Sequence, residues 1–159
     1  MASVRCLLSH QTSRTGRVEP KALPGPASER MSKQRSRDTG PERLIRSALH
    51  RRGLRYFVHR RPLPGVRREA DLVFPRLRVA IFVDGCFWHG CPEHGTKPRR
   101  NAEYWETKIA RNRARDADTD ARLEAAGWTP VRIWEHEEPD EAADQIEQLI
   151  RQRARNLAD

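Results

Sequence analysis

An apolar run that leads directly into a segment rich in cysteine and histidine is the strongest constraint on the fold of this chain. Residues 79–83 read Val-Ala-Ile-Phe-Val and predict a buried strand, and residues 84–95 follow as Asp-Gly-Cys-Phe-Trp-His-Gly-Cys-Pro-Glu-His-Gly. Side chains that emerge where a core strand ends are held rigidly and still reach the surface. We therefore expect the segment 84–95 to carry the function of the molecule.

Length and composition predict one folded domain with a modest core. The chain has 159 residues, of which 36% are hydrophobic, and this is enough for a single core. Residues 1–31 are rich in Ser, Pro and Arg and lack hydrophobic periodicity, so we expect a disordered extension there. The domain is expected over residues 32–155, and residues 156–159 form a short tail.

Basic residues are concentrated in the first half of the chain. Residues 1–78 carry a net charge of +13 and residues 79–159 a net charge of −4. Arginine supplies 27 of the 31 basic residues, and its planar guanidinium suits phosphate groups and base edges. No apolar run reaches the ~18 residues that a membrane-spanning helix needs. Nucleic acid is therefore the expected partner, and a membrane is not.

Hydrophobic periodicity predicts an α/β fold in which helices flank a mixed sheet. A helix over residues 42–50 follows the capping-box pattern Thr39-Gly-Pro-Glu42. A second helix should run from Asn101 to about residue 126, with a possible interruption at residues 118–120, and a third from residue 139 to about 153. Strands are expected at residues 56–59, 70–74, 78–83 and 131–134.

Three candidate zinc ligands lie within nine residues, in the pattern Cys86-x4-Cys91-x2-His94. Tetrahedral zinc takes four such ligands, and a site closed by four protein side chains is structural. Two buried free thiols beside surface histidines are the alternative interpretation. The three cysteines of the chain are too few for a disulfide framework, so we expect a reducing compartment, the cytoplasm.

His136 is the preferred fourth zinc ligand. It follows the strand at residues 131–134, which could run beside residues 79–83 and bring the two strand ends together. His89 and Glu93 are alternatives for the same position.

A second set of residues could bind magnesium. Asp71 opens the strand at residues 70–74, and a hairpin would bring it close to the backbone carbonyl of Val83. Oxygen ligands of this kind suit magnesium, which polarises a phosphate and stabilises the leaving oxygen. His89, if it is not a zinc ligand, could accept a proton from the attacking water. Taken alone, Asp71 would be only a charge at the edge of a strand.

Two aromatic residues, Phe87 and Trp88, lie beside glycines in a polar segment, where burial of both rings would be difficult. Exposed rings on a basic surface can insert between base pairs. The alternative is a segment that folds back so that the rings line the core.

One face of the helix that begins near Asn101 is unusual. It combines apolar and polar side chains at spacings of 4, 3 and 4 residues, namely Trp105, Ile109, Asn112 and Asp116. Because Asn and Asp are uncommon in a core stripe, this face is expected to border the active site.

Four motifs, in this order, resemble the very short patch repair (Vsr) DNA mismatch endonucleases. They are Asp-Gly-Cys-Phe-Trp-His-Gly-Cys-Pro at 84–92, Tyr-Trp-x-x-Lys at 104–108, Asn-x-x-x-Asp at 112–116 and Gly-Trp…Trp-Glu-His at 127–136. The resemblance runs from about residue 32 to 151 and implies a restriction-endonuclease-like core. It also implies magnesium-dependent nicking on the 5′ side of the T in a T:G mismatch, the lesion left when 5-methylcytosine deaminates.

The resemblance also implies roles for individual residues. Asp71 resembles the metal-binding catalytic acid, with the Val83 carbonyl as a second metal contact, and His89 resembles the general base. Glu42 and Asp116 match acids that support metal-bound waters, although the capping box by itself would explain Glu42.

For DNA contacts, Phe87, Trp88 and Trp105 match aromatic residues that insert beside the mismatch. Lys108 and Arg111 are also expected to contact DNA. The resemblance places structural zinc ligands at Cys86, Cys91 and His136.

Two departures from the pattern affect these expectations. The wider nuclease superfamily usually places an acid and a lysine on the strand that holds Val83 and Gly85, and neither is found here. The mechanism would therefore depend on His89. The zinc ligand near His94 varies among members, so Glu93 remains an alternative.

Two other functions fit the same residues. One is a restriction-type nuclease that needs no mismatch, and the other is a zinc-stabilised DNA-binding module without catalytic activity. For the preferred function, the expected partners are double-stranded DNA with a T:G mismatch and other repair proteins. A monomer is expected, because nicking one strand needs only one active site. Association with the nucleoid is expected from the DNA substrate.

Overall fold

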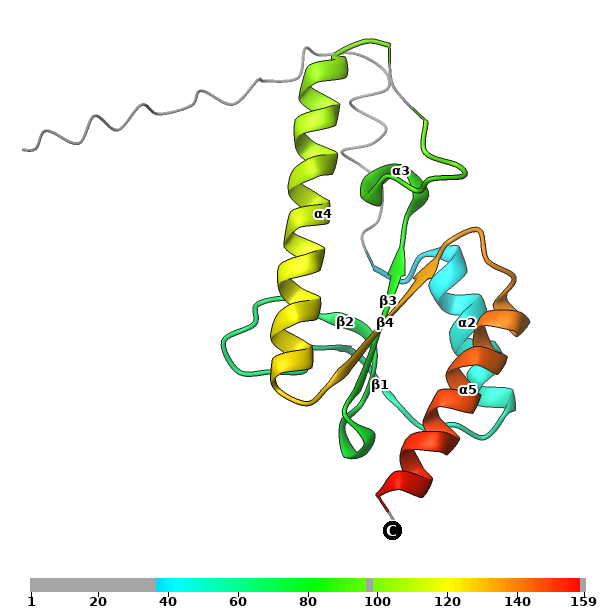
Figure 1. The fold of residues 1–159 in the computed structure, drawn as a ribbon. Coiled ribbons are helices and arrows are strands. Elements are labelled where there is room, and N and C mark those ends of the chain that lie inside the picture. Colours follow the sequence, from blue (N-terminus) through cyan, green and yellow to red (C-terminus); the bar gives the residue numbers. More distant parts are fainter. Residues whose placement is uncertain (1–36, 97–98, 158–159) are drawn as a thin grey trace, which may run out of the picture.

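The computed structural model describes residues 37–96 and 99–157 (Figure 1). The expected N-terminal extension at residues 1–31 lies outside the described residues. The elements, in chain order, are α2 (Gly40–Arg51), β1 (Phe57–Arg60), β2 (Ala70–Phe74), the 3₁₀ turn η1 (Pro75–Leu77), β3 (Val79–Asp84), α3 (Cys86–His89), α4 (Ala102–Ala125), β4 (Thr129–Trp134) and α5 (Pro139–Asn156). In the part of the chain that is described, no helix is both long enough and apolar enough to cross a membrane.

The four strands form one mixed sheet in the order β1-β2-β3-β4. β1, β2 and β3 pair antiparallel, whereas β4 pairs parallel with β3 in a register that sets Val79 opposite Thr129 and Asp84 opposite Trp134. A parallel pair needs a crossover connection, and α4 provides it. The predicted mixed sheet and the predicted neighbourhood of the last two strands are confirmed.

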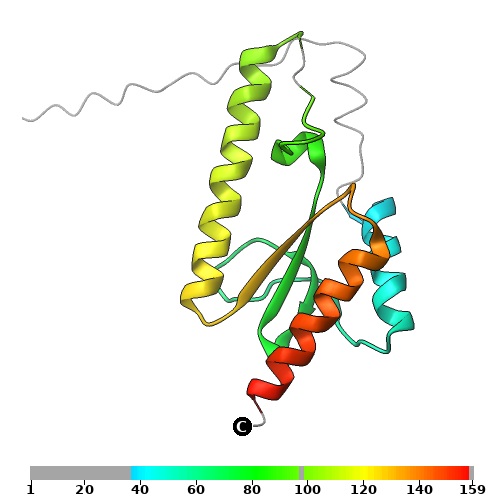
Figure 2. The same cartoon turned by 45° about the vertical axis from the view of Figure 1, so that its right-hand side comes forward.

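Helices cover both faces of this sheet. α4 lies on one face, α2 and α5 lie side by side on the other, and the view turned by 45° agrees (Figures 1 and 2). Side chains alternate along a strand, so β3 serves both layers. Val79 and Ile81 belong to the core under α2 and α5, whereas Ala80 and Phe82 belong to a smaller cluster that includes Leu123 of α4.

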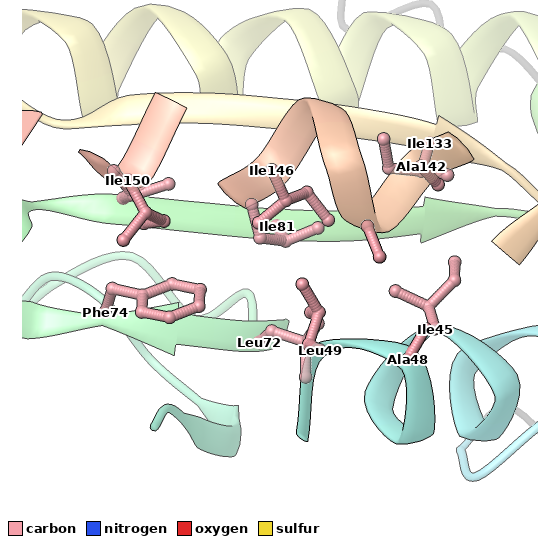
Figure 3. Close-up of a cluster of buried hydrophobic side chains, with 12 residues drawn as sticks. Ile45, Ala48, Leu49, Leu72, Phe74, Ile81, Ile133, Ala142, Ile146 and Ile150 are labelled. Atoms are coloured by element: carbon pink, nitrogen blue, oxygen red, sulfur yellow. The ribbon is translucent and has the colours of Figure 1, made fainter. Parts of the chain in front are cut away.

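The larger core lies between the sheet, α2 and α5 (Figure 3). It is built almost entirely from aliphatic side chains on the inward stripes of the two helices and on one face of the strands. Its buried members are Ile45, Ala48, Leu49, Leu72, Phe74, Val79, Ile81, Ile133, Ala142, Ala143, Ile146 and Ile150.

The long helix α4 is continuous over 24 residues, so the possible interruption at residues 118–120 does not occur. Each polar side chain there has a partner that is compatible with a helix. Thr119 donates to the Arg115 carbonyl at 2.8 Å, Asp118 pairs with Arg122, and Asp120 pairs with Arg132 of β4. Two contacts within the helix and one to β4 therefore offset the low helix propensity of these residues.

The predicted capping box takes a different form. Glu42 is buried, and its carboxylate accepts hydrogen bonds from the Thr39 hydroxyl at 2.8 Å and from the Asp38 backbone N–H at 2.9 Å. The Thr39 side chain does not cap the helix backbone, and neither does the Asn101 side chain at the start of α4. The first turn of α2 is thus held together through the Glu42 carboxylate.

Candidate functional site

The ends of β3 and β4 bring two distant segments of the chain together. The Glu135 backbone N–H donates to the Asp84 carbonyl at 3.0 Å, which extends the parallel pairing beyond the strands. The Glu135 carboxylate in turn accepts the Cys86 backbone N–H at 2.6 Å, at the start of α3. The segment after β3 and the segment after β4 therefore form one edge of the sheet.

Four candidate zinc ligands meet at this edge. The ligand atoms of Cys86, Cys91, His94 and His136 all lie within 4.8 Å of one another. His136 Nδ1 is 3.1 Å from Cys86 Sγ and 3.8 Å from Cys91 Sγ. Both thiols are buried, and burial beside Cys91 raises the pKa of the Cys86 thiol to about 11.

This donor set fits zinc, because two sulfur and two imidazole ligands are a common structural combination. The cluster also bears on His89 and Glu93, the two alternatives to His136 as the fourth zinc ligand. His89 is not a member of the cluster, and Glu93 lies at its edge, with its carboxylate 3.5 Å from His136 Nε2.

His89, at the end of the short helix α3, faces the long helix α4. Its Nδ1 lies 2.6 Å from Asp116 Oδ2. Burial and the hydrogen bond from His89 act in opposite directions on the Asp116 pKa, which is lowered on balance. An ionised carboxylate can only accept, so Nδ1 carries the proton and Nε2 of the neutral ring is left as an acceptor. Burial lowers the His89 pKa, but Asp116 and Asp84 raise it above its usual value overall.

Asp71 lies against the backbone of Val83, as predicted, but through a different atom. Its Oδ2 accepts the Val83 backbone N–H at 2.7 Å, where the sequence led us to expect proximity to the carbonyl. Burial raises the pKa of Asp71 to about 6, with smaller contributions from the negative charges of Glu42 and Asp84. Asp71 is thus a partly buried carboxylate in a negative field, and a divalent cation bound to it would offset this repulsion.

Arg132 of β4 is a site residue that the sequence reasoning missed. Its Nη1 donates to both oxygens of Asp84, at 2.9 and 2.8 Å, and its Nε donates to Asp120 at 2.8 Å. Asp84 is buried and was not assigned a role from the sequence. The sequence did contain a sign of this role. An arginine within the apolar run Val-Arg-Ile-Trp requires an acidic partner, because a charged side chain is seldom buried without one.

The aromatic residues are packed together instead of being freely exposed. The rings of Phe87 and Trp88 are 5.2 Å apart, and each contacts Trp105, at 5.2 and 5.8 Å between centroids. Trp105 is only 6% exposed and packs edge-on against both of the other rings. Phe87 and Trp88 are half-buried, which lies between the two interpretations of the sequence.

The α4 face that was expected to border the active site lies against the short helix α3. The Asn112 side chain donates to the Trp88 carbonyl at 2.9 Å, and Asp116 contacts His89 one turn later. Lys108 lies on the same helix with its Nζ 4.9 Å from the Trp88 ring, and Arg111 is exposed. Gly90 ends α3 in the left-handed region, at φ 65°, where a Cβ would approach Ile109 to 2.9 Å.

Comparison with known proteins agrees with this arrangement. Residues 22–94 match the family model described as DNA mismatch endonuclease Vsr. The chain is 44% identical over 126 residues to the Type II nicking enzyme V.NaeI of Lentzea aerocolonigenes, an alignment that covers 77% of this chain and 75% of that relative. It is 41% identical to the Type II nicking enzyme V.XorIIP of Xanthomonas oryzae pv. oryzae, over 81% of this chain and 89% of the relative.

A further relative carries the name of the family itself. The DNA mismatch endonuclease Vsr of Escherichia coli K12 is 37% identical over 101 residues, which cover 63% of each chain. The residues that match the family model include the strands β2 and β3 and the segment that follows them. The chain belongs to the Vsr family of DNA mismatch endonucleases and is a DNA endonuclease.

Proposed function

We propose that the protein nicks one strand of duplex DNA on the 5′ side of the T in a T:G mismatch, with magnesium as its cofactor, and so initiates very short patch repair of deaminated 5-methylcytosine. The observation that carries this proposal is the pairing of His89 with Asp116, next to Asp84, whose negative charge also raises the pKa of the partly buried Asp71. The similarity to two nicking enzymes and one mismatch endonuclease supports it. A mixed sheet with helices on both faces is compatible with a restriction-endonuclease-like core.

Asp71, with the Val83 carbonyl, is the proposed magnesium ligand set, and Glu42 supports the bound waters. The raised pKa of Asp71 supports this role, because it indicates a partly buried carboxylate near other negative charges. When bound, magnesium supplies a Lewis acid that polarises the scissile phosphate and stabilises the leaving oxygen.

His89 is the proposed general base. The hydrogen bond to Asp116 fixes the ring with Nδ1 protonated, so Nε2 is the nitrogen that takes the proton from the attacking water. Asp116 then stabilises the imidazolium that forms. Its position on a rigid helix that packs against α3 keeps the ring in one orientation.

Cys86, Cys91, His94 and His136 are the proposed structural zinc ligands. Zinc would tie the segment after β3 to the segment after β4 and thereby hold α3 in place. Native mass spectrometry should find one zinc ion per chain, and Cys91→Ser should lose it and lower the melting temperature. An unchanged zinc content in Cys91→Ser would exclude this ligand set.

Phe87 and Trp88 are the proposed DNA-inserting residues, and Lys108 and Arg111 are proposed phosphate contacts. A ring that is half-buried can enter the stack after a small local movement, at a cost of a few kcal/mol that new stacking offsets. Trp105 would act from beneath, as the support that orients Phe87 and Trp88.

The deciding experiment uses three duplexes that differ only at one position, which holds G:C, G:T or A:T. Each is incubated with the protein and magnesium, and the products are resolved on a denaturing gel. The proposal expects a nick in the G:T duplex alone. Equal cutting of all three would indicate a restriction-type nuclease, and binding without any product would indicate a DNA-binding module.

A further inference from the structure

Arg132 lies on the same side of the sheet as His89 and Asp116. In the parallel register, Arg132 is opposite Phe82, and its guanidinium lies 4.9 Å from the centre of the Phe82 ring. Alternation along β3 turns Phe82 and Asp84 toward the layer that contains α4. An arginine whose side chain is 24% exposed is thus directed into the space between the sheet and α4.

Three carboxylates surround this guanidinium. Asp84 accepts from Nη1 with both oxygens, and Asp120 accepts from Nε at 2.8 Å and from Nη2 at 3.1 Å. Asp116, one turn before Asp120 on α4, lies 3.6 Å from Nη2 through its Oδ1. Arg132 therefore connects the end of β3 with two successive turns of α4.

Two of these carboxylates also contact His89. Asp116 Oδ2 is 2.6 Å from His89 Nδ1, and Asp84 Oδ1 is 3.5 Å from the same nitrogen. Asp116 thus directs one oxygen to Arg132 and the other to His89. Asp84 and Asp116 both lie between the guanidinium and the imidazole ring.

We infer that Arg132 is a positioning residue for the nicking reaction: it holds Asp84 and Asp116 in the orientation that fixes His89. The inference rests on the proposed role of His89 as the general base. Two carboxylates that converge on one partly buried nitrogen repel each other, and the fork of the guanidinium offsets this repulsion while setting the direction of each carboxylate. Without it, Asp84 and Asp116 would rotate toward water, and His89 would lose its fixed orientation.

The same contacts give Asp84 a role that differs from that of Asp71. Asp84 directly follows Val83, where an acid could bind the magnesium ion. Both of its oxygens are instead taken by Arg132. Arg132 thus separates the acids that orient the base, Asp84 and Asp116, from the proposed metal acid.

The test compares Arg132→Met, which removes the charge and keeps a long side chain, with Arg122→Met as a matched control. Arg122 forms an exposed pair with Asp118 on α4 and contacts none of the site residues. Single-turnover nicking of a G:T duplex and the dissociation constant for that duplex are measured for each variant. We expect Arg132→Met to slow nicking about 10- to 100-fold with the dissociation constant changed less than about twofold, and Arg122→Met to match the wild type.

Arg132→Lys covers the case in which Arg132→Met does not fold. Lysine keeps the charge but cannot contact Asp84 and Asp120 as a planar fork, so its nicking rate should lie between those of the wild type and a folded Arg132→Met. A second measurement does not depend on activity. The ring nitrogen NMR shifts of His89 should indicate a single Nδ1-protonated form in the wild type and a mixture of forms in the Arg132 variants.

His89→Ala separates failure of this inference from failure of the proposed function. If His89→Ala retains full nicking, the proposed base is wrong. If His89→Ala abolishes nicking while folded Arg132 variants keep the wild-type rate and a single His89 form, only the positioning role is overturned. Weaker DNA binding at an unchanged nicking rate would also overturn it, because Arg132 would then act on binding alone.

Discussion

The two faces of the sheet are built from different kinds of side chain. The face toward α2 and α5 is filled with aliphatic residues such as Ile45, Ile81 and Ile146. The face toward α4 has a smaller apolar cluster, and next to it the ionic contacts of Arg132 with Asp84 and Asp120. The difference indicates that one face supplies most of the stability, while the other gives up apolar packing to position charged groups.

The largest effect is expected on the α4 face, from His89→Ala. Removing a general base slows a reaction by about 10² to 10⁴-fold, and we expect this loss in single-turnover nicking of a G:T duplex. His50→Ala, at an exposed histidine near the end of α2, is the control and should leave the rate unchanged. A His89→Ala protein that nicks at the wild-type rate would remove the catalytic role of this face.

On the α2 and α5 face, Ile146→Ala is expected to lower stability and leave nicking unchanged. Ile146 is 1% exposed within the larger core, so truncation should lower the free energy of unfolding by about 2 to 5 kcal/mol. Urea unfolding measures this change, and Leu44→Ala, at a 57% exposed residue of α2, should cost far less. Nicking per folded molecule should stay at the wild-type level, and a comparable loss of both quantities would mean that the two faces are not separate.

Asp71→Asn tests how much the ionised Asp71 carboxylate lowers the free energy of unfolding. Because the Asp71 pKa rises from 3.8 to about 6 on folding, the stabilisation that this group contributes at low pH is lost as the pH rises through that interval. In buffer without added divalent cations, we expect the wild type to lose about 2 kcal/mol relative to Asp71→Asn between pH 4 and pH 7. Denaturant unfolding at several pH values gives the two curves, and parallel curves would contradict the raised pKa of this carboxylate.

The smallest effect is expected on the solvent-exposed side of α5, at Arg151. Its pair with Glu147 on α5 has an exposed guanidinium, and pairs of this kind contribute about 0 to 1 kcal/mol. Arg151→Ala should therefore change the free energy of unfolding by less than about 0.5 kcal/mol and leave nicking unchanged. A larger change would show that the ion pair, and not only the apolar stripe of α5, contributes substantially to the free energy of unfolding.

Local patterns were sufficient to predict much of the fold. The strand at residues 70–74 has the bounds predicted from its apolar run, and the last helix follows its inward stripe of Ala142, Ala143, Ile146 and Ile150. The approach of His136 to Cys86 was also predicted, because parallel strands end at the same edge of a sheet.

The remaining features depend on contacts between distant elements. The helix α3 has only four residues, which is too short for a periodic signal. Trp105 is buried because α3 lies over it, and the sequence does not show that packing. The register of β3 with β4 brings Arg132 to Asp84, and the position of α4 brings it to Asp120. The role of Arg132 therefore becomes visible only when β3, β4 and α4 are packed together.

Mapping the break in a G:T duplex at single-nucleotide resolution tests the central claim most directly. Each strand is labelled in turn and treated with the protein and magnesium, with Asp71→Asn as the inactive control. We predict one break, in the strand that carries the mismatched T and on its 5′ side, with the G strand intact. Breaks in both strands, breaks unrelated to the T, or equal cleavage by Asp71→Asn would contradict it.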